Sequence, residues 1–392
     1  MLFRSNSAAG FADSDGNLLT SAEDLSALKQ DMTLQQAASL VRIKQNTISK
    51  DDYDLIIGEG DKKLQISIED GAIDPTPNPP KPDTVNPATD ALMESSLSVA
   101  ASLFSADDLL VESALTSRNS ARMDGPFAAA RAGTWNYDTK TRREADVYSA
   151  LLGWNINMES LSFGPFIEIG HANYDTRTSV DGASQSGSGR HNYVGAGVYG
   201  NWQTPFYVRL TGYLKGGVLE NHYGVNLLGQ ATDFDRSSGY WGAHVGAHFD
   251  LALTDNLRAR PFVSYFYDGR EKETYNQAAI GEAKGATFAY DALNLHRVQV
   301  GSLFEYAYSE TARPYFGITY EHVIKGKAEG SARDHEGELT LNASDIEGGT
   351  GIITAGWSYL NTPKDFELNL GVNGYVGTRN GVSAQMNANW LF

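Results

Sequence analysis

The most constraining feature of this sequence is a series of long segments, from Pro126 to the last residue, in which apolar and polar residues alternate. Twelve such segments are found, at 126–137, 145–157, 161–175, 190–203, 206–221, 238–253, 256–269, 293–309, 312–324, 349–361, 366–377 and 381–392. Many contain about ten or more residues, the length that a tilted strand needs to cross a bilayer. Strands of soluble proteins average about five or six residues. The segments therefore predict membrane-spanning β-strands.

The alternation also indicates which face of each strand meets lipid. Between Trp241 and Leu251, the apolar residues take every second position, and His244 and His248 lie among the glycines of the other face. A polar inner face and an apolar outer face are typical of a membrane barrel. A soluble barrel has the opposite arrangement.

The connections between these segments alternate in length. Short connections are expected at 157–160, 203–205, 254–255, 309–311 and 362–365. The long ones are expected at 138–144, 176–189, 222–237, 270–292 and 324–348, and 377–381 is the one short member of this set. Tight periplasmic turns and long outer loops are typical of an up-and-down barrel. Twelve strands also close without leaving an unpaired edge in lipid.

Aromatic residues near many strand ends predict girdles at the two membrane interfaces. The residues assigned to these girdles are Trp135, Tyr137, Trp154, Trp202, Tyr240, Trp241, Tyr265, Tyr267, Tyr306, Tyr308, Trp357, Tyr359 and Trp390.

Composition excludes some classes of function. The net charge of −17 argues against nucleic-acid binding, which needs basic surface. The chain has no cysteine, so it has neither disulfides nor thiolate metal sites. The first residues lack the apolar core of a signal peptide, and we therefore expect a C-terminal piece of a longer secreted precursor.

The first part of the chain differs from the barrel segments. Residues 1–75 are mixed in character, with amphipathic helices expected over 22–44 and a hairpin over 53–68. A calcium-like loop at 13–17 departs from the EF-hand spacing, and we interpret it as a turn. A proline-rich linker at 76–89 and a helix at 90–120, with Ser105 capping its second segment, precede the barrel at 121–392.

The last strand ends in an aromatic residue, with apolar residues at every second position before it. The positions concerned are Met386, Ala388, Trp390 and Phe392. This pattern resembles the signal by which the outer-membrane assembly machinery recognises its clients. An amphipathic edge strand can pair with a strand of a partner.

Residues 85–392 resemble the translocator domain of monomeric autotransporters, the type V secretion family. The stretches that carry the resemblance are Phe163 to Glu168, Arg313 to His322 and Asn373 to Gly381. The resemblance implies an all-β, twelve-stranded antiparallel transmembrane barrel with an α-helix threaded through its lumen. It implies a monomer in the outer membrane of a Gram-negative bacterium, in contact with lipid and the assembly machinery. It further implies that the barrel anchors its own passenger segment, of which residues 1–75 are a remnant, and assists its transfer to the cell surface.

We hypothesise that charged residues inside the barrel hold the helix in place. The inward candidates on the strands are Arg131, Glu168, Arg209, Lys215, His244, His248, Arg297, Glu305 and Glu321. The acidic residues of the helix are Glu94, Asp107, Asp108 and Glu112. Partly desolvated ion pairs contribute more than exposed ones. The alternative is a wet lumen in which these charges are simply solvated.

Other classes of function fit the sequence less well than a translocator. Some autotransporters cut their passenger inside the barrel, for which Asn119 with Glu168 is the candidate site, although no cleavage motif surrounds it. A porin or channel would need an open lumen. A protease or lipase barrel would need a catalytic group among Asp175, His191 and His296, which form no motif. A soluble adhesin does not fit apolar-out strands. We expect no enzyme activity, cofactor or metal.

Overall fold

The computed structural model describes fifteen ranges of the chain. They are 9–12, 18–19, 41–43, 53–57, 64–68, 90–116, 124–138, 142–180, 183–206, 208–227, 230–277, 285–334, 338–341, 344–361 and 365–390. The chain divides into two compact units. One unit comprises Met1–Thr89, Asn276–Phe288 and Ser331–Leu341, and the other comprises Asp90–Tyr275, Ala289–Gly330 and Asn342–Phe392.

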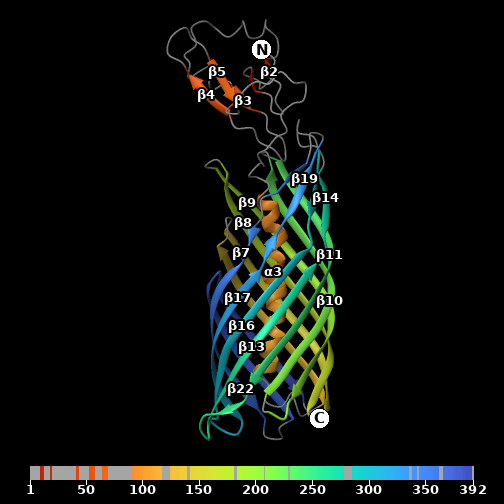
Figure 1. The fold of residues 1–392 in the computed structure, drawn as a ribbon, viewed down its shortest axis with the longest axis vertical. Coiled ribbons are helices and arrows are strands. Elements are labelled where there is room, and N and C mark those ends of the chain that lie inside the picture. Colours follow the sequence, from red (N-terminus) through yellow and green to blue (C-terminus); the bar gives the residue numbers. More distant parts are fainter. Residues whose placement is uncertain are drawn as a thin grey trace. The chain divides into compact units, whose positions relative to one another are not determined.

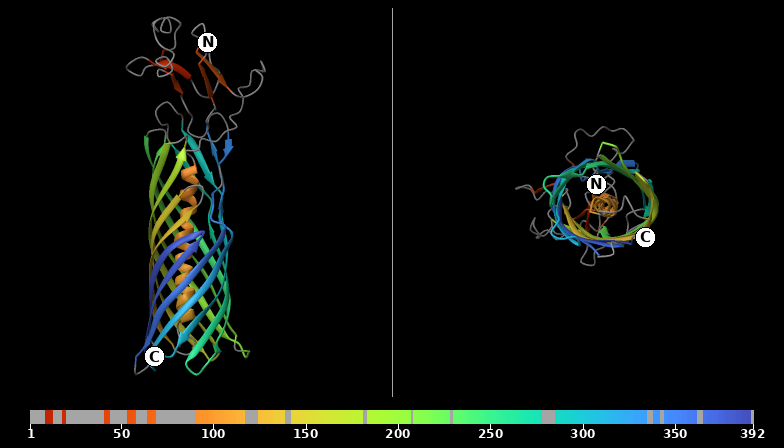
Figure 2. Two further views of the ribbon diagram at one scale, coloured as in Figure 1. Left: turned by 90° about the vertical axis from the view of Figure 1, so that its left-hand side faces the viewer. Right: turned by 90° about the horizontal axis from the view of Figure 1, so that it is seen from below.

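The second unit is a closed antiparallel barrel of twelve strands, as the sequence predicts (Figures 1 and 2). Its strands are β6 (Gly125–Asp138), β7 (Arg142–Met158), β8 (Leu161–Val180), β9 (Ala183–Gln203), β10 (Val208–Leu227), β11 (Gln230–Phe249), β13 (Leu257–Arg270), β16 (Leu293–Tyr306), β17 (Ala312–Lys325), β22 (Gly348–Leu360), β23 (Phe366–Gly377) and β24 (Arg379–Trp390). A short strand, β12 (Leu251–Ala252), continues β11 and pairs with β13. The barrel closes where β24 pairs with β6, at Ala384 and Ala132 for example.

Three connections predicted as long loops are mostly paired strand. β8 runs to Val180 and β9 resumes at Ala183, so the predicted loop at 176–189 is a hairpin. The same holds for 222–237, between β10 and β11, and for 138–144, between β6 and β7. These segments extend beyond the apolar belt, so lipid does not select apolar residues on their outer face, yet the backbone ladder continues to pair. The absence of an apolar outer face concealed the strands in the sequence.

The remaining long connections contain short strands. These are β14 (Glu273–Gln277), β15 (Ala286–Tyr290), β18 (Lys327–Ala328), β19 (Gly330–Arg333), β20 (Glu338–Thr340) and β21 (Ser344–Asp345). β18 pairs with β21, and β19 pairs with β20.

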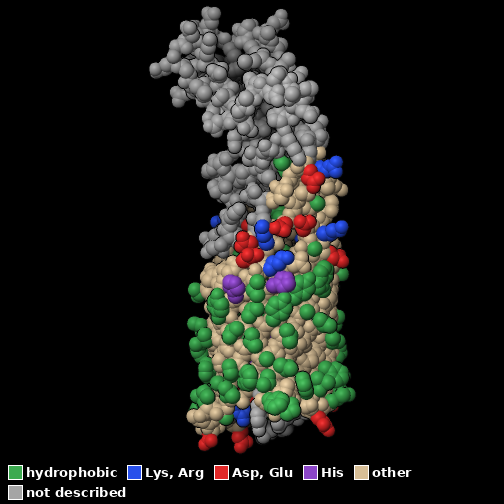
Figure 3. Space-filling model, viewed as in Figure 1, with side chains coloured by type: hydrophobic (Ala, Val, Ile, Leu, Met, Phe, Trp, Pro, Cys, Tyr) green, Lys and Arg blue, Asp and Glu red, His purple; other side chains and the backbone are tan. Residues whose placement is uncertain are grey.

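The outer face of the barrel is apolar and the inner face is polar. On β11, Val245 is 58% exposed, whereas the neighbouring inward residue His244 is 7% exposed. Figure 3 shows this belt of hydrophobic side chains on the face in view. An apolar exterior is what the hydrocarbon core of a bilayer requires. The predicted orientation of the strand faces is confirmed.

Three of the aromatic residues assigned to the girdles are wrongly placed by the sequence analysis. Trp135, Tyr137 and Tyr240 are between 0% and 2% exposed and face the lumen. Side chains alternate along a strand, so the register that turns Arg131 inward also turns Trp135 and Tyr137 inward. The assignment failed because it used distance from the strand end without the register.

One helix, α3 (Asp90–Thr116), lies inside the barrel, as the view along the axis in Figure 2 shows. It contains no glycine or proline and is rich in alanine, leucine and serine, so nothing in its sequence interrupts the helix. The expected second cap at Ser105 is wrong, because Ser105 lies in the middle of one continuous helix. Within the described ranges, no helix has both the length and the hydropathy needed to span a membrane.

The first unit contains short strands in its described residues. They are β1 (Ala9–Ala12), β2 (Leu18–Leu19), β3 (Val41–Ile43), β4 (Tyr53–Ile57) and β5 (Leu64–Ile68). β4 and β5 form the hairpin predicted at 53–68. The helix predicted over 22–44 is wrong at Val41–Ile43, where β-branched residues favour the strand that is found. The rest of that segment, the calcium-like residues 13–17 and the linker 76–89 lie outside the described residues.

Candidate functional site: the helix inside the barrel

The helix α3 is buried on all sides. Its polar residues Ser95, Ser98 and Ser102 are as inaccessible as Leu97, at 0% to 1% exposed. The helix contacts strands β6 to β10 and β16 of the barrel wall. The polar side chains of such a helix need hydrogen-bonding or charged partners on the barrel wall, because buried polar groups without partners cost free energy. The lumen of the barrel is therefore the candidate functional site.

Hydroxyl groups make most of the contacts in the N-terminal half of α3. Ser95 Oγ lies 2.8 Å from Tyr174 OH, and Arg236 Nη2 donates to Ser95 Oγ at 3.1 Å. Ser98 Oγ lies 2.8 Å from His191 Nε2. Tyr174 and His191 belong to the outer parts of β8 and β9, so Asp90 marks the outer end of the helix.

One buried arginine that faces this half of the helix has few polar partners. Arg143 is 0% exposed, and its Nη1 lies 3.5 Å from Glu94 Oε2. None of its three side-chain nitrogens forms a hydrogen bond, although the guanidinium lies 4.6 Å from the centre of the Tyr137 ring. A buried guanidinium without hydrogen bonds retains much of its desolvation cost.

Carboxylates dominate the C-terminal half of α3. Asp107 Oδ1 lies 2.8 Å from Lys215 Nζ and accepts a hydrogen bond from Tyr213 OH at 2.5 Å. The second oxygen, Oδ2, lies 3.3 Å from Arg297 Nη2. Both oxygens of this carboxylate are therefore matched by cationic or hydroxyl donors of the wall.

Asp108 is surrounded by three arginines. Its carboxylate lies 2.5 Å from Arg297 Nη1, 3.1 Å from Arg379 Nη2 and 3.5 Å from Arg131 Nη1. Glu321 of the wall lies 2.8 Å from Arg297 and 2.9 Å from Arg379. The wall carboxylate thus completes a network in which each arginine meets more than one acid.

Two further carboxylates extend this network. Glu112 lies 2.8 Å from Arg131 Nη2, and Glu168 lies 3.4 Å from Lys215 Nζ and accepts a hydrogen bond from Tyr240 OH at 2.7 Å. We call the whole network the lumenal charge cluster. Its members are Asp107, Asp108, Glu112, Arg131, Glu168, Lys215, Arg297, Glu321 and Arg379.

The remaining predicted charges lie elsewhere on the inner wall. Arg209 Nη2 lies 3.2 Å from Asp250 rather than on a helix carboxylate. Glu305 lies 2.7 Å from Arg313 and 3.7 Å from Arg260. These pairs join neighbouring strands near the tight-turn end of the barrel, so they connect the wall to itself.

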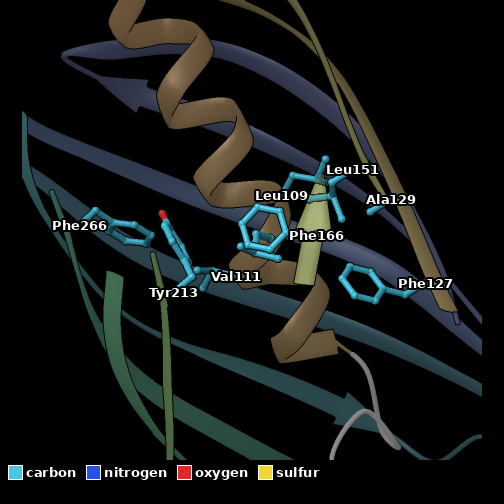
Figure 4. Packing of buried hydrophobic residues seen from close by; sticks show 9 residues of the cluster. Leu109, Val111, Phe127, Ala129, Leu151, Phe166, Tyr213 and Phe266 are labelled. Carbon is cyan, nitrogen blue, oxygen red and sulfur yellow. The ribbon is translucent and has the colours of Figure 1, made fainter. Parts of the chain in front are cut away.

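An apolar cluster packs beside the C-terminal half of the helix. In Figure 4, Leu109 and Val111 of α3 lie among side chains of the surrounding strands. The cluster consists of Leu109, Leu110, Val111, Phe127, Ala129, Leu151, Phe166, Tyr213 and Phe266. Burying apolar side chains contributes roughly 1.5–3 kcal/mol each for the larger ones. The helix is therefore held by packing as well as by charge.

Arg379 is the main site residue that sequence reasoning missed. It was assigned to a turn at 377–381, but it begins β24 and is 1% exposed. In the last strand Ser383 and Gln385 alternate with the apolar residues and therefore face inward, and extending that alternation backwards places Arg379 on the inner face too. The register was therefore sufficient to find it.

The proposed insertion signal and cleavage residues are only partly described. Met386 and Trp390 are 49% and 42% exposed on the outer wall, and Ala388 is buried. Trp390 packs against Phe366 of the neighbouring strand, with ring centroids 5.5 Å apart. Phe392 and Asn119 lie outside the described residues.

The residues considered for a hydrolase do not converge within the described part of the chain. Asp175 is exposed, His191 is buried against Ser98, and His296 contacts Tyr265 on the outer wall.

Comparison with known proteins identifies the family. A family profile described as "Autotransporter beta-domain" matches residues 127–373, more than half of the chain. The chain belongs to this family. Among curated proteins, none matches this chain by sequence.

Solved structures of autotransporter domains share the fold. The translocator domain of NalP from Neisseria meningitidis superposes with a TM-score of 0.59 at 9% identity, covering 76% of this chain and 98% of that one. The transport unit of AIDA-I from Escherichia coli gives 0.57 at 16% identity, with coverages of 78% and 99%. The β domain of BrkA from Bordetella gives 0.51 at 14% identity, with coverages of 69% and 100%.

The autotransporter domain is an outer-membrane barrel of a Gram-negative bacterium with a translocator role. The alternative of a porin is not favoured, because a porin needs an open lumen and α3 occupies this one with fully buried side chains.

Proposed function

We propose that this barrel anchors an N-terminal passenger in the outer membrane and assists its passage to the cell surface, without catalysis of its own. In this proposal, residues 1–75 are the remnant of the passenger, 76–89 are the linker, 90–120 the lumenal helix and 121–392 the membrane domain. The observation that supports it is the polarity of α3. Ser95 and Ser98 contact Tyr174 and His191 towards the outer ends of β8 and β9, whereas Asp107, further along the helix, contacts Lys215 in the inner half of β10. A chain threaded in this direction presents whatever precedes it to the outside.

Charge matching supports the idea that the helix remains in the lumen once transport is complete. The carboxylates of α3 meet Lys215, Arg297, Arg379 and Arg131 on four different strands. A segment that merely passed through the lumen would not need matched partners on opposite walls. We infer that the lumenal charge cluster fixes the final position of the helix.

The proposal is tested by locating the N-terminus in living cells. The full chain, preceded by a cleavable export signal and a short epitope, is expressed in a Gram-negative host, and protease is added outside. We expect loss of the epitope in intact cells while a barrel-sized fragment stays protected in the outer-membrane fraction. An epitope digested only after the outer membrane is permeabilised would contradict the proposal. Self-cleavage at Asn119 is checked separately by comparing the size of the wild-type chain with that of Asn119→Ala.

A further inference from the structure

The outward-facing charges above the apolar belt differ between two sides of the barrel. On strands β7 to β11, the exposed charged residues are mostly acidic, namely Glu144, Asp146, Asp175, Glu220, Asp233 and Asp235. On strands β13, β16 and β17, six of the outward residues towards the outer ends are aromatic or basic. They are Tyr265, Tyr267, His296, Tyr320, His322 and Lys325, which we call the basic–aromatic patch. Histidine and cationic side chains are visible at the upper edge of the apolar belt in Figure 3.

A β-bulge brings Lys325 into this patch. His296 pairs with Lys325, but the next residue, Arg297, pairs with Val323, so β17 contains one extra residue at this point. Side chains alternate along a regular strand, and Lys325 would therefore face the lumen if His322 and Ile324 face outward. With the bulge, all three are exposed. Bulges commonly re-aim a side chain beside a functional site.

Neighbouring aromatic side chains hold His296 in place. Tyr265 OH lies 2.7 Å from His296 Nδ1, and the Tyr267 ring lies 5.0 Å from the imidazole. Tyr267 in turn donates to Asn294 Oδ1 at 2.9 Å and accepts from Trp241 Nε1 at 3.4 Å. Tyrosine and tryptophan are usual at a membrane interface, but the imidazole that they hold here adds a polar group that can bind a ligand with a polar head.

The charge of the patch is available for a ligand. Lys325 is exposed and forms no ion pair within the described residues. The second imidazole, His322, is exposed and stacks on Tyr320, with ring centroids 6.3 Å apart. Tyr320 and Ile324 are 56% and 53% exposed and lie on the same strand. The patch therefore offers one ammonium group and two imidazoles beside apolar surface.

We propose that the basic–aromatic patch binds a phosphorylated glycolipid of the outer leaflet. The phosphate accepts hydrogen bonds from Lys325 and the imidazoles, since charge-assisted bonds of this kind are strong. The tyrosine rings and Ile324 contact the sugar and the first methylene groups, where aromatic side chains prefer to lie. The acidic outer wall of β7 to β11 repels the same headgroup. The ligand is thus directed to one side of the barrel.

The test uses the full chain refolded in detergent, with diphosphoryl lipid A and the phosphate-free form of the same lipid as probes. Native mass spectrometry measures the bound lipid, and heat-modified gel mobility measures the temperature at which the folded barrel is lost. We expect the wild type to prefer the phosphorylated lipid. The variant His296→Gln/His322→Gln/Lys325→Gln should lower that preference by about fivefold or more. The single variant Lys325→Gln should lower it partly, and Lys325→Arg should restore it.

The matched control is Arg190→Gln/His222→Gln, which removes basic groups from the acidic side of the barrel. This control should bind the phosphorylated lipid as the wild type does. Equal binding of phosphate-free lipid, or wild-type binding by the triple variant, would overturn the proposal. Stabilisation by inorganic phosphate alone to the same extent would also overturn it, since it would indicate a small-anion site rather than a lipid site.

Discussion

The two halves of α3 are held in different ways. The outer half, from Glu94 to Ser105, contacts the wall through serine hydroxyls and one long ion pair, Glu94 to Arg143 at 3.5 Å. The inner half, from Asp107 to Glu112, carries three carboxylates that meet four cationic side chains, most of them within 3.3 Å. Most side chains of both halves are buried. The main difference therefore lies in the chemistry of the partners.

This difference indicates which part of the helix fixes it in the lumen. A hydrogen bond between neutral groups contributes about 0.5–1.5 kcal/mol, whereas breaking one side of a buried ion pair costs roughly 3–5 kcal/mol. The inner half should therefore determine whether the helix stays in the lumen. The outer half, with small side chains and neutral contacts, should tolerate substitution.

The largest effect is expected from Asp107→Asn/Asp108→Asn. The change leaves Lys215, Arg297 and Arg379 buried without these acids, a cost of roughly 3–5 kcal/mol per broken pair. We expect the helix to leave the lumen and the single-channel conductance of the refolded full chain to rise several-fold.

The matched control for that change is Ser95→Ala/Ser98→Ala in the outer half. It removes hydroxyl contacts to Tyr174 and His191, and we expect the pore to remain closed. A closed pore in the Asp107→Asn/Asp108→Asn variant, or an equally open pore in the serine variant, would mean that the inner half does not hold the helix more strongly than the outer half.

The apolar cluster beside the inner half is probed by a pair of neighbouring leucines. Leu151 is 2% exposed and faces the lumen, whereas Leu152 is 56% exposed and faces lipid. Leu151→Ala should cost about 2–4 kcal/mol of unfolding free energy in guanidinium titrations, because it leaves a cavity beside the helix. Leu152→Ala should cost clearly less, since lipid can fill the space. Equal losses would show that the helix does not pack tightly against this wall.

The contribution of one ion pair is measured by a double-mutant cycle on Arg131 and Glu112. The two lie 2.8 Å apart, but the Glu112 side chain is 22% exposed, so solvent weakens the pair. We expect a coupling energy of about 1–2 kcal/mol from Arg131→Gln, Glu112→Gln and the double variant. A coupling energy near zero would indicate that Arg131 acts mainly through Asp108.

Much of the barrel could be predicted from the sequence, because the bilayer imposes a pattern. Strands such as β13 and β23 match their predicted bounds within one residue, since lipid selects apolar residues on one face. The outer extensions of β8 to β11 were missed because they lie beyond the lipid, which therefore does not select apolar residues on their outer face.

The candidate site was harder to predict than the fold. The sequence indicates that Arg297 and Asp108 carry charge and face the lumen, but it cannot indicate which strand stands opposite which turn of the helix. That depends on how far α3 is inserted, which is a tertiary property. Arg209 illustrates the point, since it forms an ion pair with Asp250, directly after β11, rather than with a helix carboxylate.

The smallest effect is expected from Glu94→Gln/Arg143→Met in the outer half. Arg143 is fully buried and its nitrogens form no hydrogen bonds, so the pair recovers little of what its desolvation costs. Replacing a buried ion pair by groups of similar volume is often neutral or stabilising. We expect the unfolding free energy to change by less than about 1 kcal/mol, and the pore to stay closed in single-channel recordings. Arg143→Met alone is the informative comparison, because it removes the guanidinium next to the buried Glu94 carboxylate and should destabilise more than the double change. If the double variant opened the pore as widely as Asp107→Asn/Asp108→Asn, the helix would be held along its whole length, and its two halves would be equivalent despite their different chemistry.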